Sequence, residues 1–448
     1  MLKKNIILSL IGFFTVATVA FSTMQLQKNH KNKKKHREKP DPHVTIMGPV
    51  VMADGIGRQT AELAKMLAHD YKVRIVSNSI VLDDVPREVK KILNTEYKGL
   101  GKVVIVEESL WAPDGRAERI DRMFDTVAQD DQIRFAYSMI ESSRVINEWA
   151  MMLNLYFDGV IVPDPFLVEA YRDSGVTIPI FYVPLAVDLK DFINRPLKKK
   201  KEKGPMVFAN LSTAIERKNQ ALLIKAFAKA LGNNPNAALV INSRYNDITT
   251  RNKIMDTLAE CKCSNIFYSD IVLRKDAYLK LFENIDCYVS LSTGEGFSIQ
   301  PREAMALGIP VIATNNTAQS AICKTGLVRS VKSEILQPAH YYNHRLPTGY
   351  QFNCTLEDAT AAIKDVYLNY DYYLSKGVES RKWASTFSYS NENNIKSYQT
   401  IVNPKDVVLG NENTITNDCI ITDSKELQEK YQRLILNQKK KSKTKKKK

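Results

Sequence analysis

Two kinds of hydrophobic pattern alternate along the chain between residues 44 and 400. Short runs of β-branched and aromatic residues predict buried strands, whereas apolar residues at three- and four-residue spacing predict amphipathic helices. The strand-like runs of the first half are HVTIMG, KVRIVS, KVVIVEE, RFAYSM, DGVIVP and IPIFYVP, and those of the second half are PMVFANL, AALVINS, NIFYSD, IDCYVSLS and PVIATN. Segments such as RQTAELAKMLA and QALLIKAFAKAL have the helical spacing.

This alternation predicts an α/β fold with parallel sheets that helices cover on both faces. Eleven strands are too many for one open sheet of ordinary size. The segment RPLKKKKEKGP, at 195–205, contains four consecutive lysines and a Gly-Pro pair, which are typical of a solvated linker. We therefore predict two doubly wound, Rossmann-like domains at 41–197 and 205–385, a basic linker at 198–204 and a closing segment at 386–402.

The end of the chain has a different pattern and is predicted to form an extension, at 403–448. Residues 403–423 are polar and have no clear period. Asp423 is placed to cap a short helix over 424–437, with apolar residues on one face. A lysine-rich tail follows this helix. We expect the tail to be solvated, or to contact anionic lipid headgroups.

The first forty residues are predicted to form a membrane anchor and a basic segment beside it. No charged residue lies between Asn5 and Gln27, and most of 6–24 is apolar. This length is close to the roughly 20 residues that cross a bilayer. A cleaved signal peptide is the alternative, but 18–20 (Thr-Val-Ala) is a poor cleavage site. We favour an uncleaved transmembrane helix over residues 5–26.

The distribution of charge predicts the orientation of this anchor and argues against nucleic acid as a partner. Two lysines precede the apolar segment and seven Lys or Arg follow it by residue 39, which predicts a cytoplasmic location for the rest of the chain. The net charge is +15, but the first forty residues carry nine Lys or Arg against one Glu, and the last ten carry eight Lys. The residues between them are almost neutral, unlike a nucleic-acid-binding domain.

The six cysteines lie in the second half of the chain, at 261, 263, 287, 323, 354 and 419. The pair at 261 and 263 has no second pair at the spacing of a zinc site. We predict free thiols, which suit a reducing compartment.

Ligands of open parallel sheets bind beyond the carboxyl ends of the strands, and three strand-to-helix junctions are equipped for binding. The first is GPVVMADGIGRQT at 48–60. Gly55 and Gly57 allow close approach of a ligand, and the N–H groups of the following helix can bind an anion. A tight turn alone also explains such glycines. A phosphate-binding P-loop is excluded, because no Gly-Lys-Ser/Thr follows.

The second junction is FANLSTAIERKNQALL, at 208–223. Arg217 and Lys218 stand just before a predicted helix, after a strand and a polar loop. Two cations and a helix N-terminus at one place can hold a diphosphate. A solvated surface pair is the alternative.

The third junction is GEGFSIQPREAMALGIPVIAT, at 294–314. Pro301 is predicted as the first helical residue and Gly308 as the end of the helix. Glu303 then falls in the first helical turn, where the helix dipole stabilises a carboxylate, so a structural role would explain it.

Glu295 has no such structural explanation. It lies in a glycine turn after a strand, where its carboxylate can accept hydrogen bonds from a polyhydroxylated ligand. The backbone N–H groups of Phe297 and Ser298 are expected to point into the same space. Two carboxylates also flank the bond in glycosidases, but the position of Glu303 at a helix start does not suit that role.

The two acids form a Glu-x7-Glu motif within EGF…P-x-EAMA-x-G-x-PVIAT, which resembles family 4 of the retaining glycosyltransferases with the GT-B fold. IESSRVINEWAMMLN, DGVIVPDPFLVEAYRDSGV and VPLAVD look like the end of that family's first domain. ERKNQALLIKAF resembles its donor-phosphate segment, and the similarity spans about 44–400.

The resemblance implies two domains that face each other across a cleft, with a nucleotide-sugar donor on the second and the acceptor on the first. It implies that Lys218 holds the donor diphosphate and that Gly57 lets the first domain approach it. It further implies that Glu295 and the amides of Phe297 and Ser298 contact the sugar, and Glu303 the ribose. No metal or other cofactor is expected, because no DxD-type pair lies in a convincing loop.

Two departures from the family pattern leave roles open. Many relatives have Gly-Arg where this chain has Ala209-Asn210, which leaves Arg217 as the substitute beside Lys218. Many also have a histidine near the sugar in the first domain, but the segment AYSMIESSR has none. Glu141 is the polar candidate in that segment.

These observations predict a membrane-anchored glycosyltransferase that retains the anomeric configuration of the sugar. The sequence leaves a lipid, a glycan and a protein open as the acceptor. A nucleotide-sugar epimerase and a catalytically inactive sugar-nucleotide-binding protein are the alternatives.

Overall fold

The computed structural model describes residues 41–445, except 53, 78, 108–130, 245–246, 341–346 and 417, and describes the backbone alone for 441–445. The predicted transmembrane helix, at residues 5–26, lies outside these residues. Within the part described, none of the helices is both long and apolar enough to cross a membrane.

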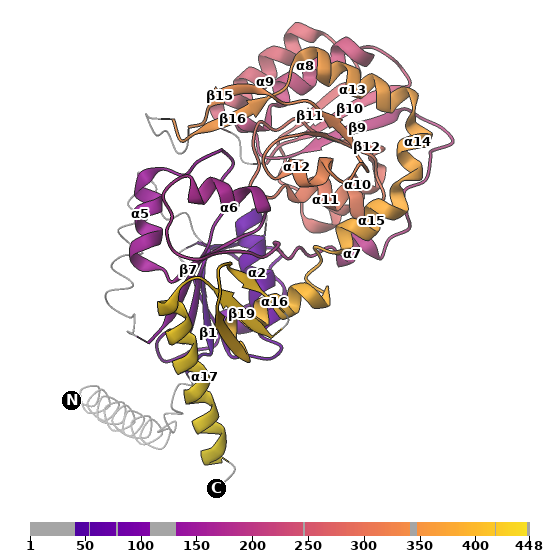
Figure 1. The fold of residues 1–448 in the computed structure, drawn as a ribbon. Helices are drawn as coiled ribbons and strands as arrows, with labels where there is room; N and C mark the ends of the chain where they lie inside the picture. Colours follow the sequence, from indigo (N-terminus) through magenta and orange to yellow (C-terminus); the bar gives the residue numbers. More distant parts are fainter. Residues whose placement is uncertain are drawn as a thin grey trace, which may run out of the picture. The chain divides into compact units, whose positions relative to one another are not determined.

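The first domain is built on a parallel sheet of six strands in the order β3-β1-β5-β6-β7-β8. Figure 1 labels β1 and β7 of this sheet, with α2 and α5 near them. The strands are β1 (Val44–Met47), β3 (Val73–Val76), β5 (Val103–Val106), β6 (Ile133–Tyr137), β7 (Gly159–Val162) and β8 (Ile180–Tyr182). In the register of the sheet, Ile46 lies between Ile75 and Ile105. The helices are α2 (Gly55–Leu67), α3 (Arg87–Leu93), α5 (Asn147–Tyr156), α6 (Pro165–Arg172) and α7 (Lys190–Ile193), and β2 (Val50–Val51) pairs with β4 (Ile80–Val81).

The second domain is built on another parallel six-stranded sheet, in the order β11-β10-β9-β12-β13-β14. Its strands are β9 (Met206–Leu211), β10 (Ala237–Asn242), β11 (Ile266–Ser269), β12 (Cys287–Ser290), β13 (Val311–Thr314) and β14 (Arg329–Val331). The helices are α8 (Gln220–Leu231), α9 (Ile248–Cys261), α10 (Lys275–Asn284), α11 (Ile299–Ala306), α12 (Gln319–Cys323), α13 (Leu356–Leu368), α14 (Tyr370–Ser375) and α15 (Gly377–Ser385). A hairpin of β15 (Ile335–Pro338) and β16 (Tyr350–Asn353) is antiparallel.

The prediction of two Rossmann-like parallel sheets is confirmed, and each of the eleven predicted strands is present. In chain order the second sheet runs 3-2-1-4-5-6, which reverses direction between β9 and β12. The first sheet reverses between β1 and β5. Ligands of doubly wound folds bind at such reversal points, beyond the carboxyl ends of the strands.

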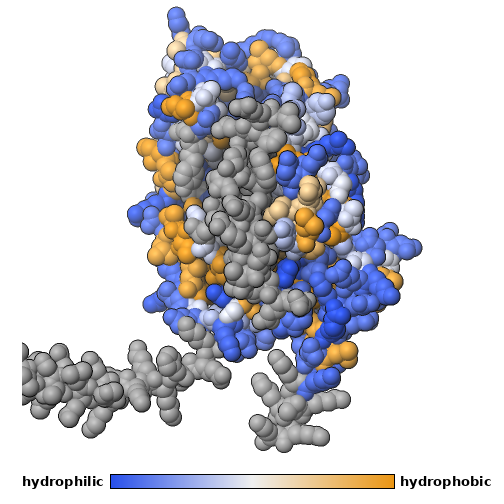
Figure 2. All heavy atoms as spheres, turned by 90° about the vertical axis from the view of Figure 1, so that its left-hand side faces the viewer, coloured by the Kyte–Doolittle hydropathy of each residue, from blue (hydrophilic) through white to orange (hydrophobic). Residues whose placement is uncertain are grey.

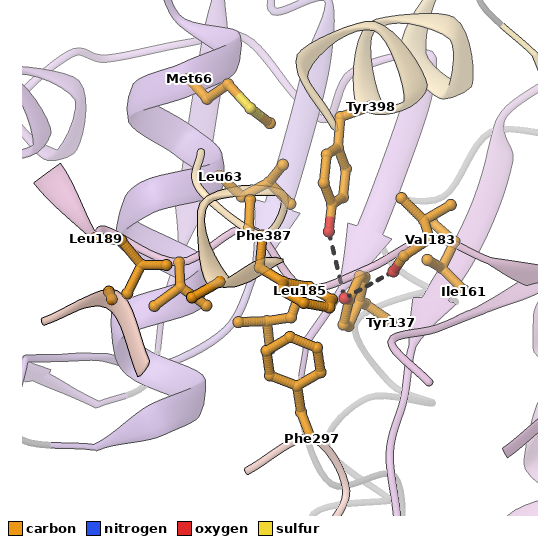
Figure 3. Packing of buried hydrophobic residues seen from close by; sticks show 14 of the residues in the cluster. Leu63, Met66, Tyr137, Ile161, Val183, Leu185, Leu189, Phe297, Phe387 and Tyr398 are labelled. Carbon is orange, nitrogen blue, oxygen red and sulfur yellow. Dashed lines mark hydrogen bonds between the residues drawn. The ribbon is translucent and has the colours of Figure 1, made fainter. Parts of the chain in front are cut away.

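The chain returns from the second domain to the first through α15 and α16 (Glu392–Val402). Figure 3 shows Phe387 and Tyr398 packed beside Leu63, with Phe297 of the second domain in the same cluster. The Tyr398 hydroxyl donates to the carbonyl oxygen of Pro184 at 2.9 Å and lies 3.3 Å from the Tyr137 hydroxyl. This segment therefore joins the cores of both domains.

The polar segment 403–423, which has no clear period in the sequence, has regular structure. These residues form a three-stranded sheet of β17 (Asp406–Leu409), β18 (Thr414–Ile415) and β19 (Cys419–Thr422). The strands are two to four residues long, which is too short for a clear alternation in sequence.

The predicted C-terminal helix is present but longer, since α17 spans Lys425–Lys445. Ser424, not Asp423, caps it by accepting from the N–H of Leu427. Tyr431 is fully buried, and its hydroxyl donates to the Ile401 carbonyl at 2.6 Å. The extension is thus packed on the first domain.

The linker between the domains is less solvated than predicted. Lys198 and Lys201 both pair with Asp286, at 2.8 and 2.7 Å, and the Lys198 side chain is only 8% exposed.

On the face drawn in Figure 2, hydrophilic residues predominate over the part of the surface that is coloured, and hydrophobic residues form separate patches.

Candidate active site

The reversal point of the second sheet brings together two of the predicted junctions. Arg217 and Lys218 follow β9, in a 3-10 turn at Glu216–Lys218, and Glu295 follows β12. Because β9 and β12 are neighbours in the sheet, their carboxyl ends place these side chains side by side. Lys218 and Glu295 are 77 residues apart in the sequence, and this pairing of strands brings them into contact.

Glu295 is held by both cations. Its Oε1 lies 2.5 Å from Lys218 Nζ, and its Oε2 lies 3.2 Å from Arg217 Nη1. The other terminal nitrogen of Arg217 donates to the Glu141 carboxylate of the first domain at 2.9 Å. The side chains of Lys218 and Glu295 are only 11% and 6% exposed, so this network is shielded from water.

Burial and charge oppose each other at Glu295. Burial alone would raise the pKa of the carboxyl group, but the charges of Lys218 and Arg217 outweigh it and lower the pKa to about 2. Burial lowers the pKa of Lys218 although Glu295 is beside it. Glu295 is therefore an anion with both oxygens paired to cations, which makes it a weak nucleophile.

The glycine turn of the third junction lies against the first domain. A Cβ atom at Gly294 would come within 2.0 Å of the Glu141 carbonyl oxygen, so only glycine fits there. The backbone N–H of Glu295 donates to Thr317 Oγ1 at 2.8 Å, which fixes the turn. Phe297 directs its ring into the core against Phe387, and Ser298, with φ of +69°, begins α11. Both residues line a cavity of about 190 Å³ that lies beside Lys218.

The position of Glu303 on its helix differs from the predicted one. Helix α11 begins at Ile299, two residues before Pro301, so Glu303 is not in the first turn and does not cap it. Its side chain is fully buried and accepts from Arg58 Nη2 at 2.7 Å and from the Tyr278 hydroxyl at 2.6 Å. The contact with Arg58 joins α2 of the first domain to α11 of the second.

Gly57 lines neither of the two cavities described below. A Cβ atom at Gly57 would lie 2.4 Å from the Val51 carbonyl oxygen, so close packing inside the first domain explains this glycine. Gly55 lines the cavity beside Lys218 instead, together with Asp54 and Ile56.

Asn210 lies outside the cavity and has structural partners. It is 2% exposed, donates to the Val289 carbonyl at 2.7 Å and accepts from Ser212 and Gln220. Arg217, as expected from the sequence, supplies the cation beside Lys218.

Two cavities adjoin this cluster, and residues of both domains line each. One has a volume of about 190 Å³ and walls that include Glu141, Lys218 and Glu295. The other has about 330 Å³ and walls that include Arg58, Tyr278 and Glu303. Arg244, two residues beyond β10, lines both.

The sequence analysis did not identify Arg58, Tyr278 or Arg244 as site residues. Arg244 could have been identified, because this cation follows a predicted strand in the same way as Arg217. Among the described residues, Arg244 makes no hydrogen bond or ion pair. A cation without a protein partner on the wall of two cavities is suited to bind an anionic ligand.

Arg244→Met should weaken the binding of nucleoside diphosphates about 10- to 100-fold, the loss expected for one charge-assisted hydrogen bond. The melting temperature should stay nearly the same, because no hydrogen bond or ion pair among the described residues is lost. Calorimetric titration with UDP, GDP and ADP measures the effect. Arg251→Met is the matched control, since Arg251 pairs with Asp270 and lines neither cavity. An unchanged dissociation constant in Arg244→Met would remove Arg244 from the site.

Part of this chain is similar in sequence to known glycosyltransferases. Residues 192–331 match the family model "Glycosyl transferases group 1". A curated relative, "Uncharacterized glycosyltransferase MJ1059" of Methanocaldococcus jannaschii, is 30% identical over 141 residues, which are 31% of this chain. The match spans about a third of the length of that relative.

Solved structures share the fold at low sequence identity. A glycosyltransferase from Rickettsia africae is similar with a TM-score of 0.56 and 15% identity, over 82% of this chain and 99% of that one. Anabaena Alr3699/HepE in complex with UDP-glucose is similar with a TM-score of 0.54 and 14% identity, over 80% and 97%. Residues 192–331 are thus similar to the glycosyl transferases of group 1, and the chain has the two-domain GT-B fold of the solved structures.

Proposed function

We propose that the protein transfers a glycosyl group from a nucleotide-sugar donor to an acceptor, with retention of the anomeric configuration. The observation that carries this proposal is the cluster of Lys218, Arg217 and Glu295 at the reversal point of the second sheet. Arg244 adds a third cation on the wall of the same cavity. Such a cluster suits a ligand that combines a diphosphate with hydroxyl groups.

In this proposal the donor occupies both cavities. The nucleoside lies in the cavity of about 330 Å³, where the Glu303 carboxylate accepts hydrogen bonds from the ribose hydroxyls. The diphosphate lies between Lys218 and Arg244, which lines both cavities. The sugar lies in the cavity of about 190 Å³, beside Glu295 and the backbone of Phe297 and Ser298. The UDP-glucose complex of the similar Anabaena protein supports a nucleotide-sugar as ligand.

The chemistry that this arrangement favours is stabilisation of the leaving diphosphate. Negative charge develops on the phosphate oxygens as the glycosidic bond breaks, and fixed cations stabilise it without reorganisation. The N-terminus of α11, at Ser298–Gln300, adds N–H groups on the same cavity. Lys218 therefore acts on the leaving group, whereas Glu295 orients Lys218 and the sugar.

Retention follows in this proposal without a covalent intermediate on the protein. Both oxygens of Glu295 are paired to cations, and its low pKa makes it a poor nucleophile. The acceptor hydroxyl instead attacks the face that the diphosphate leaves, and a departing phosphate oxygen takes its proton. The test is release of nucleoside diphosphate that depends on an added acceptor. Membrane attachment through residues 5–26 stays a prediction from the sequence.

A further inference from the structure

The reversal point of the first sheet also carries a hollow, which has no role in the donor site. A recess of about 30 Å³ lies at the carboxyl ends of β5 and β6 and beside α2 and α5. Its walls are formed by first-domain residues only: Ile56, Gln59, Glu107, Tyr137, Ser138, Met139 and Trp149. Ile56, Met139 and Trp149 also line the cavity beside Lys218, so the recess adjoins the place proposed for the sugar.

Two polar atoms of the recess walls are buried without a hydrogen-bond partner in the described part of the chain. They are Nε1 of Trp149, a donor, and Oε1 of Gln59, an acceptor. The two residues are 7% and 4% exposed. A buried polar group without a partner costs about 1–3 kcal/mol, so a donor and an acceptor left open in one recess suit a polar ligand.

Glu107 adds a carboxyl group to the same wall. It is 2% exposed, follows β5 directly, and accepts from Thr60 Oγ1 at 2.9 Å and from Gln59 Nε2 at 3.3 Å. Burial raises the pKa of Glu107 to about 8, which favours the protonated form near neutral pH. The negative charge at the recess is thereby reduced, which suits a neutral hydroxyl group better than a cation.

We propose that this recess binds one hydroxyl-bearing group of a carbohydrate acceptor. A single hydroxyl group can accept from Trp149 Nε1 and donate to Gln59 Oε1, which satisfies both open atoms. An alkyl group in the same place would leave both unsatisfied, so a saccharide or polyol is favoured over a lipid chain at this point. The inference rests on the proposed function, in which the first domain binds the acceptor.

The volume of the recess is consistent with this ligand. Without an acceptor, the space is large enough for about one water molecule. A hydroxyl group of the acceptor would displace that water and reproduce its hydrogen bonds, which preserves affinity. The reacting hydroxyl of the same sugar would then lie in the adjoining cavity.

The test uses the full chain with its three tryptophans replaced by 5-fluorotryptophan and observed by fluorine NMR. Trp149→Phe assigns the Trp149 signal. Methyl glycosides of glucose, galactose, mannose and N-acetylglucosamine are titrated to 50 mM, with and without saturating nucleoside diphosphate. Dissolved butane, which has no hydroxyl group, serves as the apolar probe. We expect at least one glycoside to shift the Trp149 signal with saturation. Butane should not shift it, and the Trp383 signal should stay in place.

Gln59→Met tests the acceptor atom of the recess while it keeps the Trp149 reporter. The dissociation constant of the glycoside should rise about tenfold, the effect of one neutral hydrogen bond. Met151→Leu is the control, because Met151 lies on α5 with 60% of its surface exposed and lines neither the recess nor the cavities. Gln59→Leu, which also lacks the acceptor atom, replaces Gln59→Met if that variant does not fold.

Two results would overturn the inference: no glycoside shifts the Trp149 signal, or butane shifts it as strongly as the glycosides do. An equal dissociation constant in Gln59→Met and the parent protein would also count against it. Binding of UDP, GDP or ADP is measured on the same samples. If a nucleotide binds but no glycoside reaches Trp149, the recess inference fails and the proposed donor site stands. If no nucleotide binds, the proposed function itself fails.

Discussion

Lys218→Ala should lower kcat/KM about 10³-fold while the protein stays folded. Removal of one group that stabilises transition-state charge typically costs 10²- to 10³-fold. Here Lys218 is proposed to contact the leaving diphosphate from a site that is only 11% exposed, where its charge is poorly screened. The fold should survive, because Glu295 keeps its ion pair with Arg217 at 3.2 Å. Steady-state rates of nucleoside diphosphate release measure the effect.

Lys225→Ala is the matched control for this variant. Lys225 lies on α8, a few residues after Lys218, and pairs with Glu260 on the surface with 47% of its side chain exposed. Its removal should leave kcat/KM unchanged. Circular dichroism and the melting temperature show whether Lys218→Ala is folded, and Lys218→Met repeats the test with the side-chain volume kept. Turnover by folded Lys218→Ala at the parent rate would refute the assigned role.

Glu303→Gln should lower both stability and donor affinity. The substitution leaves Arg58, whose side chain is 16% exposed, without its counter-ion, and loss of one partner of a buried pair costs about 3 kcal/mol. It also removes the carboxylate proposed to hold the ribose, so the dissociation constant of the nucleotide should rise about 100-fold. Chemical denaturation and calorimetry measure the two effects.

A second variant separates the two roles of Glu303. In Arg58→Met/Glu303→Gln the unpaired cation is gone, so stability should recover by about half or more, whereas nucleotide affinity should stay low. Glu357→Gln is the surface control, since Glu357 pairs with Lys229 and is 71% exposed; its stability should change by less than about 0.5 kcal/mol. If affinity recovers together with stability, Glu303 is a structural residue only.

The strands of both sheets could be predicted because each is a run of β-branched and aromatic residues between turn signals. β14 was missed because it is only three residues long and contains Arg329 and Ser330. The sheet at Asp406–Thr422 was missed for the same reason of length. These short strands are buried by elements that are distant in the sequence, so the local pattern of apolar residues does not reveal them.

The sequence predicted which polar residues of the site follow the strand ends, but it did not predict the distances between their side chains. Arg217, Lys218 and Glu295 were found because polar residues follow the buried strands β9 and β12. The start of α11 was misplaced, because Pro301 is a favoured first residue of a helix, whereas the left-handed conformation of Ser298 begins the helix earlier. Gly55 and Gly57 could not be told apart, since the backbone that excludes a side chain at Gly57 is not visible in the sequence.

The contacts of Arg58 and of the recess depend on residues far apart in the chain. Arg58 and Glu303 are 245 residues apart, and Gln59 and Glu107 are 48 apart. The packing of α2 on the first sheet and the contact of Arg58 with α11 bring these groups together. No spacing rule could therefore have found them.

The most direct test of the central claim follows the reaction of the full chain by proton NMR. The donors are UDP-glucose, UDP-N-acetylglucosamine, GDP-mannose and ADP-glucose, each with and without the methyl glycosides used above, and folded Lys218→Ala is the blank. We predict that one donor releases its nucleoside diphosphate only when an acceptor is present, and that the new anomeric proton has the α configuration of that donor. Release from none of the donors, or a product of β configuration, would contradict the account.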